Sequence, residues 1–199
     1  MKAPDLFESL EPVIRAFESL GIGYMIGGSV ASSAYGMARA TLDVDVVADL
    51  EQSHIQPLIE RLQGAFYIDE ERVRDAVTRR ISFNLIHLES ILKIDVFVLK
   101  SRPYDREAFS RARLETLCED ELPRQYYVSS PEDIILSKLD WYRQGGCVSE
   151  RQWNDVLGIL KVQQSSLDMS YVRHWAEVLE LADSLSRALG DAGMTRGAE

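Results

Sequence analysis

The stretch "IGGSVASSAYGMARATLDVDVVADL", residues 26–50, places Asp43 and Asp45 one residue apart within a run of valines. Valine favours extended structure, so residues 43–48 are predicted to form a strand. Side chains alternate along a strand, and both aspartates therefore point to one face while their apolar neighbours point to the other. We expect one face of this strand to belong to the core and the opposite face to carry two carboxylates.

Two carboxylates held this close repel each other unless a cation lies between them. Mg²⁺ prefers such hard oxygen ligands and completes its shell with water and substrate phosphates. A third aspartate, Asp95, stands among apolar residues in "ILKIDVFVLK", residues 91–100, where a charge is unexpected without a polar site. The three carboxylates are candidate ligands of one or two metal ions. The alternative is an edge strand with one solvated face.

Gly27, Gly28 and Ser29 follow the short apolar run "GYMIG", residues 23–27. Glycines let a ligand approach the backbone closely, and the segment 29–37 offers free N–H groups at a predicted helix start, where phosphate is favourable. The hydroxyl of Ser29 adds a further donor. An ordinary turn, which uses the same residue types, is the alternative.

The rest of the chain divides by composition. Residues 79–88 and 91–100 are two β-rich runs with a short connection and predict a hairpin, whereas the pattern from Pro131 onward is helical. The fold class is therefore α+β. We expect a small, mixed, twisted β-sheet with flanking helices over residues 1–125, a C-terminal helical region over 126–190 and a flexible tail over 191–199.

Composition limits the function classes. Hydrophobic residues make up 46% of the 199, enough to build a core. No apolar run approaches the roughly 20 residues that cross a bilayer, and the first residues include acidic side chains that a signal peptide lacks, so a cytoplasmic protein without a membrane partner is expected. The net charge of −10 disfavours nucleic acid unless basic residues are concentrated locally. Cys118 and Cys147 are expected to be free thiols.

The glycine turn, the D-x-D and the third acidic residue together resemble the signature of the DNA polymerase β-like nucleotidyltransferase superfamily. The residues that carry this resemblance are Gly27, Gly28, Ser29, Asp43, Val44, Asp45 and Asp95. It implies the nucleotidyltransferase fold and an enzyme that uses an NTP such as ATP together with Mg²⁺ or Mn²⁺. Asp43 and Asp45 would bind both metal ions, Asp95 would serve the metal that activates the acceptor hydroxyl, and the glycine turn would hold the β- and γ-phosphates.

One branch of the superfamily is more similar still. "ARATLDVDVV", residues 38–47, and the later segments "SPEDIILSKLDWYRQGG" and "RQWNDVLGIL" resemble nucleotidyltransferases of the AbiEii/AbiGii toxin type. This resemblance makes Lys138 and Asp155 candidate active-site residues, with Lys138 near the triphosphate. The alternatives are a solvated surface lysine and an acidic charge near the start of its helix. Arg39 and Thr41 are candidates for nucleotide binding, and a strand role is the alternative for Thr41.

The toxin branch suggests RNA or tRNA as the acceptor and a cognate antitoxin as a protein partner. An acidic protein would hold RNA through local cations, and those near the motifs are Arg39, Arg79, Arg80, Lys93, Lys138 and Arg143. Arg79 and Arg80 are expected to open the strand of residues 79–88, either as a basic lip or as charges that protect a sheet edge.

Two other functions stay open. A small-molecule acceptor, as in antibiotic-modifying nucleotidyltransferases, suits the net acidity of the chain better than RNA does. A member of the fold that binds nucleotide or a partner protein without catalysis is the non-enzymatic alternative. The presence of all three aspartates together with the glycine turn favours the enzyme.

Overall fold

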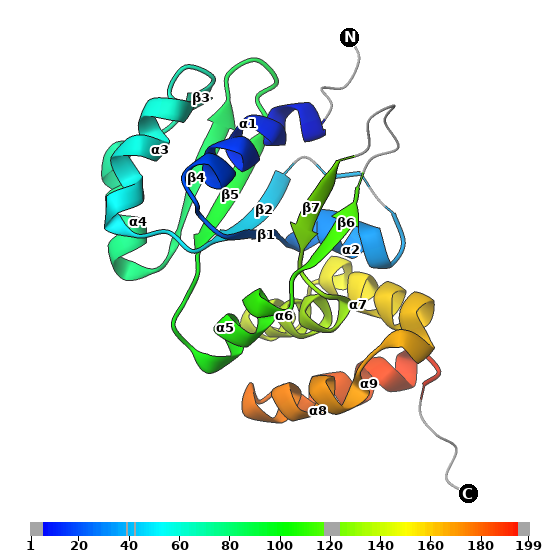
Figure 1. The fold of residues 1–199 in the computed structure, drawn as a ribbon. Helices are drawn as coiled ribbons and strands as arrows, with labels where there is room; N and C mark the ends of the chain where they lie inside the picture. Colours follow the sequence, from blue (N-terminus) through cyan, green and yellow to red (C-terminus); the bar gives the residue numbers. More distant parts are fainter. Residues whose placement is uncertain (1–5, 39, 42, 118–123, 195–199) are drawn as a thin grey trace, which may run out of the picture. The chain divides into compact units, whose positions relative to one another are not determined.

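The computed structural model of the chain describes residues 6–38, 40–41, 43–117 and 124–194 (Figure 1). Its first elements are α1 (Leu6–Ser19), β1 (Tyr24–Ile26), α2 (Gly28–Tyr35), β2 (Asp43–Ala48), the 3-10 turn η1 (Gln52–His54), α3 (Ile55–Leu62), β3 (Phe66–Tyr67), α4 (Glu70–Arg79), β4 (Ser82–His87) and β5 (Lys93–Val98). They are followed by α5 (Pro103–Ser110), β6 (Arg113–Thr116), β7 (Gln125–Val128), α6 (Pro131–Gln144), α7 (Glu150–Gln163), η2 (Gln164–Ser166), α8 (Met169–Val178) and α9 (Ala182–Asp191).

The chain forms two compact units. The first contains Met1–Gly27 and Ala40–Val128, and the second contains Gly28–Arg39 and Ser129–Glu199. All strands belong to the first unit, whereas α2 and α6 to α9 belong to the second. None of the helices in the described part of the chain is both long enough and apolar enough to cross a bilayer.

The described strands form one mixed sheet in the order β3-β4-β5-β2-β1-β7-β6. The pairs β2·β5 and β1·β7 are parallel, and the other neighbouring strands are antiparallel. The predicted hairpin is present as β4 and β5, which pair antiparallel. A mixed sheet with flanking helices confirms the predicted α+β fold class.

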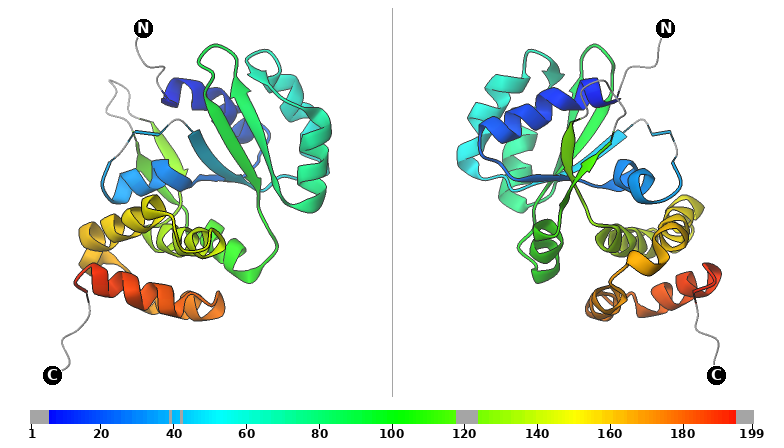
Figure 2. Two further views of the ribbon diagram at one scale, coloured as in Figure 1. Left: turned by 180° about the vertical axis from the view of Figure 1, so that it is seen from behind. Right: turned by 45° about the vertical axis from the view of Figure 1, so that its right-hand side comes forward.

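One face of the sheet is the core of the first unit. Along β2 and β5 every second residue is buried, and Val44, Val46, Ile94 and Val96 are fully enclosed. Helices α1 and α3 pack against each other and lie on one face of the sheet (Figures 1 and 2). Complete burial of one such side chain contributes roughly 1.5–3 kcal/mol, so this alternation fixes which face of β2 turns inward.

Arg79 and Arg80 do not open a strand, as the sequence suggested. Arg79 is the last residue of α4, and Arg80 ends the helix in the left-handed conformation with φ of 51°. The helix begins at Asp69, whose carboxylate caps the N–H of Arg72, and it continues up to the strand. Arg79 pairs with Asp75 one turn earlier, while Arg80 donates to the carbonyl oxygen of Leu99. The pair is thus a helix terminus, not a basic lip on the sheet.

Buried polar contacts connect the helices of the second unit. Ser130 caps α6 and donates to Asp133 Oδ2 at 2.6 Å, and Tyr171 of α8 donates to Asp133 Oδ1 at 2.7 Å. The backbone N–H of Asp168 donates to the carboxylate of Glu132. The carboxylates of Glu132 and Asp133 are almost fully enclosed, and these bonds compensate for their desolvation. They join the start of α6 to the start of α8.

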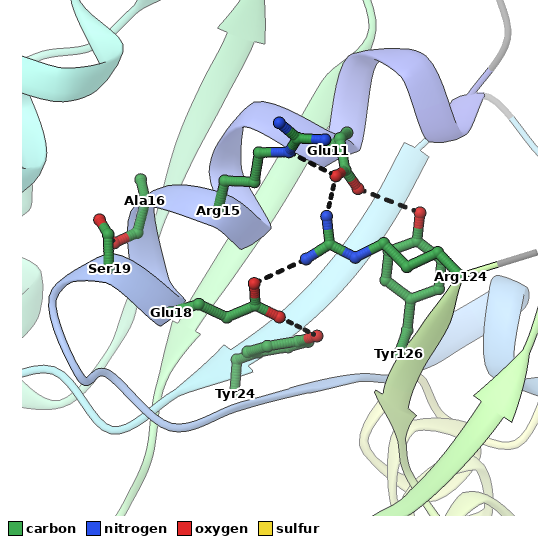
Figure 3. Close-up of polar contacts among 8 residues, drawn as sticks. All are labelled: Glu11, Arg15, Ala16, Glu18, Ser19, Tyr24, Arg124 and Tyr126. Carbon is green, nitrogen blue, oxygen red and sulfur yellow. Dashed lines mark hydrogen bonds and ion pairs between the residues drawn. The ribbon is translucent and has the colours of Figure 1, made fainter. Parts of the chain in front are cut away.

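A cluster of polar and aromatic side chains around Arg124 connects α1 to the sheet (Figure 3). The guanidinium forms ion pairs with Glu11 and Glu18 of α1, and it lies 5.5 Å from the ring centroid of Tyr126. The hydroxyl of Tyr126 donates to Glu11 Oε2 at 3.2 Å, and the hydroxyl of Tyr24 of β1 lies 3.5 Å from Glu18 Oε1. Burial, reinforced by the charge of Glu18, raises the pKa of Tyr24, so this phenol stays neutral and available as a donor.

We predict that Arg124→Ala lowers the free energy of unfolding by about 1–2 kcal/mol, because two ion pairs and a cation–π contact are lost together. Arg15→Ala is the matched control, since Arg15 is well exposed and pairs with Glu11 on the same helix. Urea unfolding followed by circular dichroism measures both variants. Equal losses in the two variants would show that Arg124 does not join α1 to the sheet.

Candidate active site

The parallel pairing of β2 and β5 brings the three aspartates onto one face of the sheet. Asp45 lies directly opposite Asp95, and Asp43 lies opposite Lys93. Neighbouring strands are about 4.8 Å apart, so residues in register on one face are within reach of a shared ligand. The aspartates alternate with the buried valines and isoleucine of the core face. The carboxylates therefore lie on the face opposite the one that forms the core.

Lys93 contributes a cation to this face. Its Nζ lies 2.8 Å from Asp95 Oδ2, and the two side chains are 44% and 14% exposed. The hydrogen bond to Asp95 raises the pKa of Lys93, and the charges of Asp95, Asp43 and Asp45 act in the same direction. Lys93 is therefore charged at neutral pH. From the sequence, Lys93 is a candidate only for contact with RNA, because the strand register that places it among the aspartates is not visible there.

Thr41 orients the first aspartate. Its hydroxyl donates to Asp43 Oδ1 at 2.6 Å and lies 3.2 Å from the carbonyl oxygen of the same residue. Thr41 precedes β2, so it is not part of the strand in the structure. This bond orients the carboxylate through its Oδ1. Arg39, the other residue predicted beside it, lies outside the described residues.

The glycine turn leaves the sheet next to Asp45. The N–H of Gly27 donates to the carbonyl oxygen of Asp45 at 2.8 Å, and α2 begins at the following residue. Gly28 has φ of 56°, which a residue with a side chain adopts only with strain. A Cβ at Gly27, by contrast, would meet no heavy atom within 4 Å among the described residues. The backbone conformation thus favours glycine at 28, whereas position 27 has open space for a side chain.

Ser29 belongs to the second unit, where it accepts a hydrogen bond. Its side chain is buried, and Arg151 Nη2 donates to its Oγ at 3.1 Å. Sequence reasoning missed Arg151. The spacing in the sequence could have indicated it, because Arg151 lies four residues before the candidate Asp155 and the two side chains share a face of α7.

Lys138 and Asp155 form a buried ion pair within the second unit. Nζ of Lys138 lies 2.6 Å from Asp155 Oδ2, and the side chains are only 5% and 8% exposed. The pair joins α6 to α7. The interpretation of Lys138 as a solvated surface residue is wrong, because the face of α6 that carries it packs inside the helical unit. Asp155 also lies beyond the first turn of α7, so it is not a charge at the helix start.

The donor set on the sheet fits a hard divalent cation by its chemistry, since carboxylate oxygens are the ligands that Mg²⁺ and Mn²⁺ prefer. Within the described residues, however, no three His, Cys, Asp or Glu side chains are gathered closely enough to hold a metal. One oxygen of Asp95 is instead bonded to the ammonium of Lys93. A metal ion would therefore have to draw the carboxylates together.

No family model and no curated protein matches the sequence. Solved structures do match it. The antibiotic-resistance factor ANT(2″)-Ia in solution gives a TM-score of 0.50 at 17% identity, with 92% of this chain and 92% of that chain covered. Its crystal structure in complex with adenylyl-2″-tobramycin gives 0.52 at 13% identity, covering 86% of this chain and 94% of that chain.

An antigenic nucleotidyltransferase-like protein from Paracoccidioides brasiliensis gives a TM-score of 0.50 at 21% identity, with 92% of this chain and 91% of that chain covered. The chain has the nucleotidyltransferase fold. This agrees with the fold that the sequence resemblance implied, whereas the likeness to the toxin branch stays a prediction.

We predict that Lys138→Met and Asp155→Leu each lower the free energy of unfolding by about 3–5 kcal/mol, because each removes one charge of a buried ion pair and leaves the other charge without it. The double variant Lys138→Met/Asp155→Leu replaces both charges with apolar side chains and should lose far less. Urea unfolding of the four proteins completes a double-mutant cycle. Additive losses in the double variant would contradict a coupled pair.

Proposed function

We propose that this protein is a metal-dependent nucleotidyltransferase that transfers an NMP from an NTP to a hydroxyl acceptor. The observation that carries the proposal is the register of β2 and β5, which sets Asp45 opposite Asp95 with Asp43 on the same face. The nucleotidyltransferase fold supports the reaction class. The open space at Gly27 also supports it, because a close ligand explains a glycine that the described backbone does not require.

Asp43 and Asp45 would hold two divalent ions, with Asp95 as a further ligand of one of them. Such ions neutralise charge on the transferred phosphoryl group and lower the pKa of a bound hydroxyl. The bond from Thr41 supports this assignment for Asp43, because it fixes one carboxylate oxygen and leaves the other available. Because the Asp43 carboxylate is already oriented, its side chain would lose less conformational freedom when a ligand binds.

The remaining steps belong to residues of the chain. Asp95 accepts the proton of the acceptor hydroxyl, the acceptor oxygen attacks the α-phosphorus, and the bond to the β-phosphate oxygen breaks, so that pyrophosphate leaves. Gly27 and Gly28 leave the backbone accessible to the β- and γ-phosphates, and Ser29 offers its hydroxyl.

Lys138 and Asp155 take a positioning role in this proposal. Because each satisfies the other inside the second unit, Lys138 is not offered to a triphosphate as a free charge. Asp155 instead anchors α7, the helix that presents Arg151 to Ser29. Arg151 is thus the cation next to the serine that is proposed to bind phosphate.

Two acceptor classes remain within the proposal. An RNA or tRNA acceptor, with a cognate antitoxin as partner, follows from the toxin-like sequence motifs. A small hydroxylated molecule is the second class, and the net charge of −10 favours it, because an acidic surface repels a polyanion and attracts a cationic compound. Arg79 and Arg80, two of the six cations considered for RNA, lie at the end of a helix and not at the start of a strand.

The division of roles is testable with single variants. Asp43→Asn and Asp45→Asn should lose metal-dependent NTP binding, whereas Asp95→Ala should keep NTP binding and lose nucleotide transfer by at least about 10²-fold. Ser29→Ala should weaken NTP binding by about 1–2 kcal/mol, the scale of one charge-assisted hydrogen bond. Isothermal titration measures binding, and release of labelled pyrophosphate measures transfer.

Asp75→Asn provides the matched control, because it removes one carboxylate from an exposed position on α4. If it behaves like the β2 variants, the effect is one of net charge. Unchanged metal-dependent NTP binding in Asp43→Asn and Asp45→Asn would place the site elsewhere.

The acceptor can be identified by incubating the protein with each α-³²P-labelled NTP, Mn²⁺ and either total RNA or a panel of aminoglycosides and lincosamides. We expect label on a small molecule, with little loss of transfer between 50 and 200 mM salt. A protein that neutralises several RNA phosphates would instead lose labelling steeply over that range, on the order of 10³-fold or more. Labelled RNA with such a salt dependence would show that the acceptor is RNA, as expected of a toxin-type enzyme.

A further inference from the structure

Lys93 occupies a position on the acidic face that the proposed reaction does not use. It lies opposite Asp43 across the β2–β5 pair and two residues before Asp95 on its own strand, so its side chain projects from the same face as all three aspartates. Its ammonium is 2.8 Å from Asp95 Oδ2. The hydrogen bond to Asp95 and the charges of all three aspartates raise the pKa of this ammonium, in keeping with its place on their face.

The energetic reason for a cation here is repulsion. Asp45 and Asp95 face each other in register, and a like-charged pair directly opposite in a sheet is destabilising. The ammonium on Asp95 offsets part of that repulsion. A hydrogen-bonded contact to Asp95 also occupies an oxygen that a metal ion would need.

We propose that Lys93 is an internal counter-cation, whose ammonium holds Asp95 in the absence of metal and must leave that carboxylate when a divalent ion binds. This inference rests on the proposed metal site. The contact between Lys93 and Asp95 differs from a fixed structural salt bridge, because 44% of the Lys93 side chain is exposed and its four-carbon stem can move into solvent. Because the ammonium reaches solvent while the carboxylate is only 14% exposed, a doubly charged ion can take the place of the ammonium at Asp95.

Two consequences follow from the competition. Lys93 should reduce the affinity of the face for a divalent ion, since binding must first break the contact with Asp95. It should also stabilise the metal-free protein, since it neutralises part of the carboxylate cluster. Removing the ammonium must therefore tighten metal binding and weaken the metal-free fold, a pair of effects that loss of a metal ligand does not produce.

The test uses the full-length chain and Mn²⁺ alone, with affinity measured by isothermal titration and by electron paramagnetic resonance of free Mn²⁺. The variants are Lys93→Met, Lys93→Arg and Lys100→Met. Lys100 is the matched control, because it is an exposed lysine two residues beyond the end of β5 and its loss changes the net charge equally. We expect Lys93→Met to bind Mn²⁺ about two- to fivefold more tightly than the wild type, the range given by a partly exposed ion pair.

Lys93→Arg and Lys100→Met should bind Mn²⁺ no more tightly than the wild type. The difference between Lys93→Met and the wild type should shrink as ionic strength rises, because salt screens the ammonium. In EDTA, Lys93→Met should melt at a lower temperature than the wild type, and saturating Mn²⁺ should remove that difference.

Each outcome separates this inference from the proposed function. Wild-type protein that binds Mn²⁺ with the same affinity as Lys93→Met overturns the counter-cation and leaves the nucleotidyltransferase proposal standing. Weaker binding by Lys93→Met also overturns it, because Lys93 would then support the site. If none of the proteins binds Mn²⁺, with or without NTP, the metal site itself is wrong and both proposals fall.

Discussion

The structure depends on one constraint: β2 must present an apolar face to the core and an acidic face away from it. Val44 and Val46 are fully enclosed, and Asp43 and Asp45 lie between and beside them. A slip of one residue in the pairing with β5 would bury the carboxylates and expose the valines, at a cost of several kcal/mol. The core therefore fixes the site, because the same alternation that packs the sheet sets Asp45 opposite Asp95.

Local patterns predicted the strand of Asp43 and Asp45 and the hairpin of β4 and β5, but not the parallel pairing of β2 with β5. The valine-rich run gave the orientation of Asp43 and Asp45, since alternation is a property of any single strand. Parallel pairing of β2 with β5 joins residues about fifty positions apart, and no turn connects them. The role of Lys93 follows only from that register. Arg79 was misplaced for a different reason, because a helix of low hydropathy runs directly into β4 and its end carries no glycine.

The helical unit shows a second limit of sequence reasoning. Lys138 lies on a helix whose apolar and polar residues do not separate cleanly, and nine of its residues are buried. A lysine in such a helix is ordinarily solvent-exposed. Its partner, Asp155, comes from another helix, so neither residue alone reveals the pair. The resemblance to a known branch singled out both positions, but it could not distinguish a phosphate contact from an internal ion pair.

A lysine that competes for Asp95 affects how far the free divalent ion and the metal–nucleotide complex each occupy the proposed site. A divalent ion alone must displace Lys93 and gains only a few carboxylate oxygens, whereas an ion that arrives with an NTP also brings phosphate ligands and has part of its hydration already replaced. The cost of displacing Lys93 is the same in both cases, so it lowers both affinities by the same factor. In the proposed site, Lys93 would therefore reduce occupancy by the weakly bound free ion at concentrations at which the more tightly bound metal–nucleotide complex still fills the site.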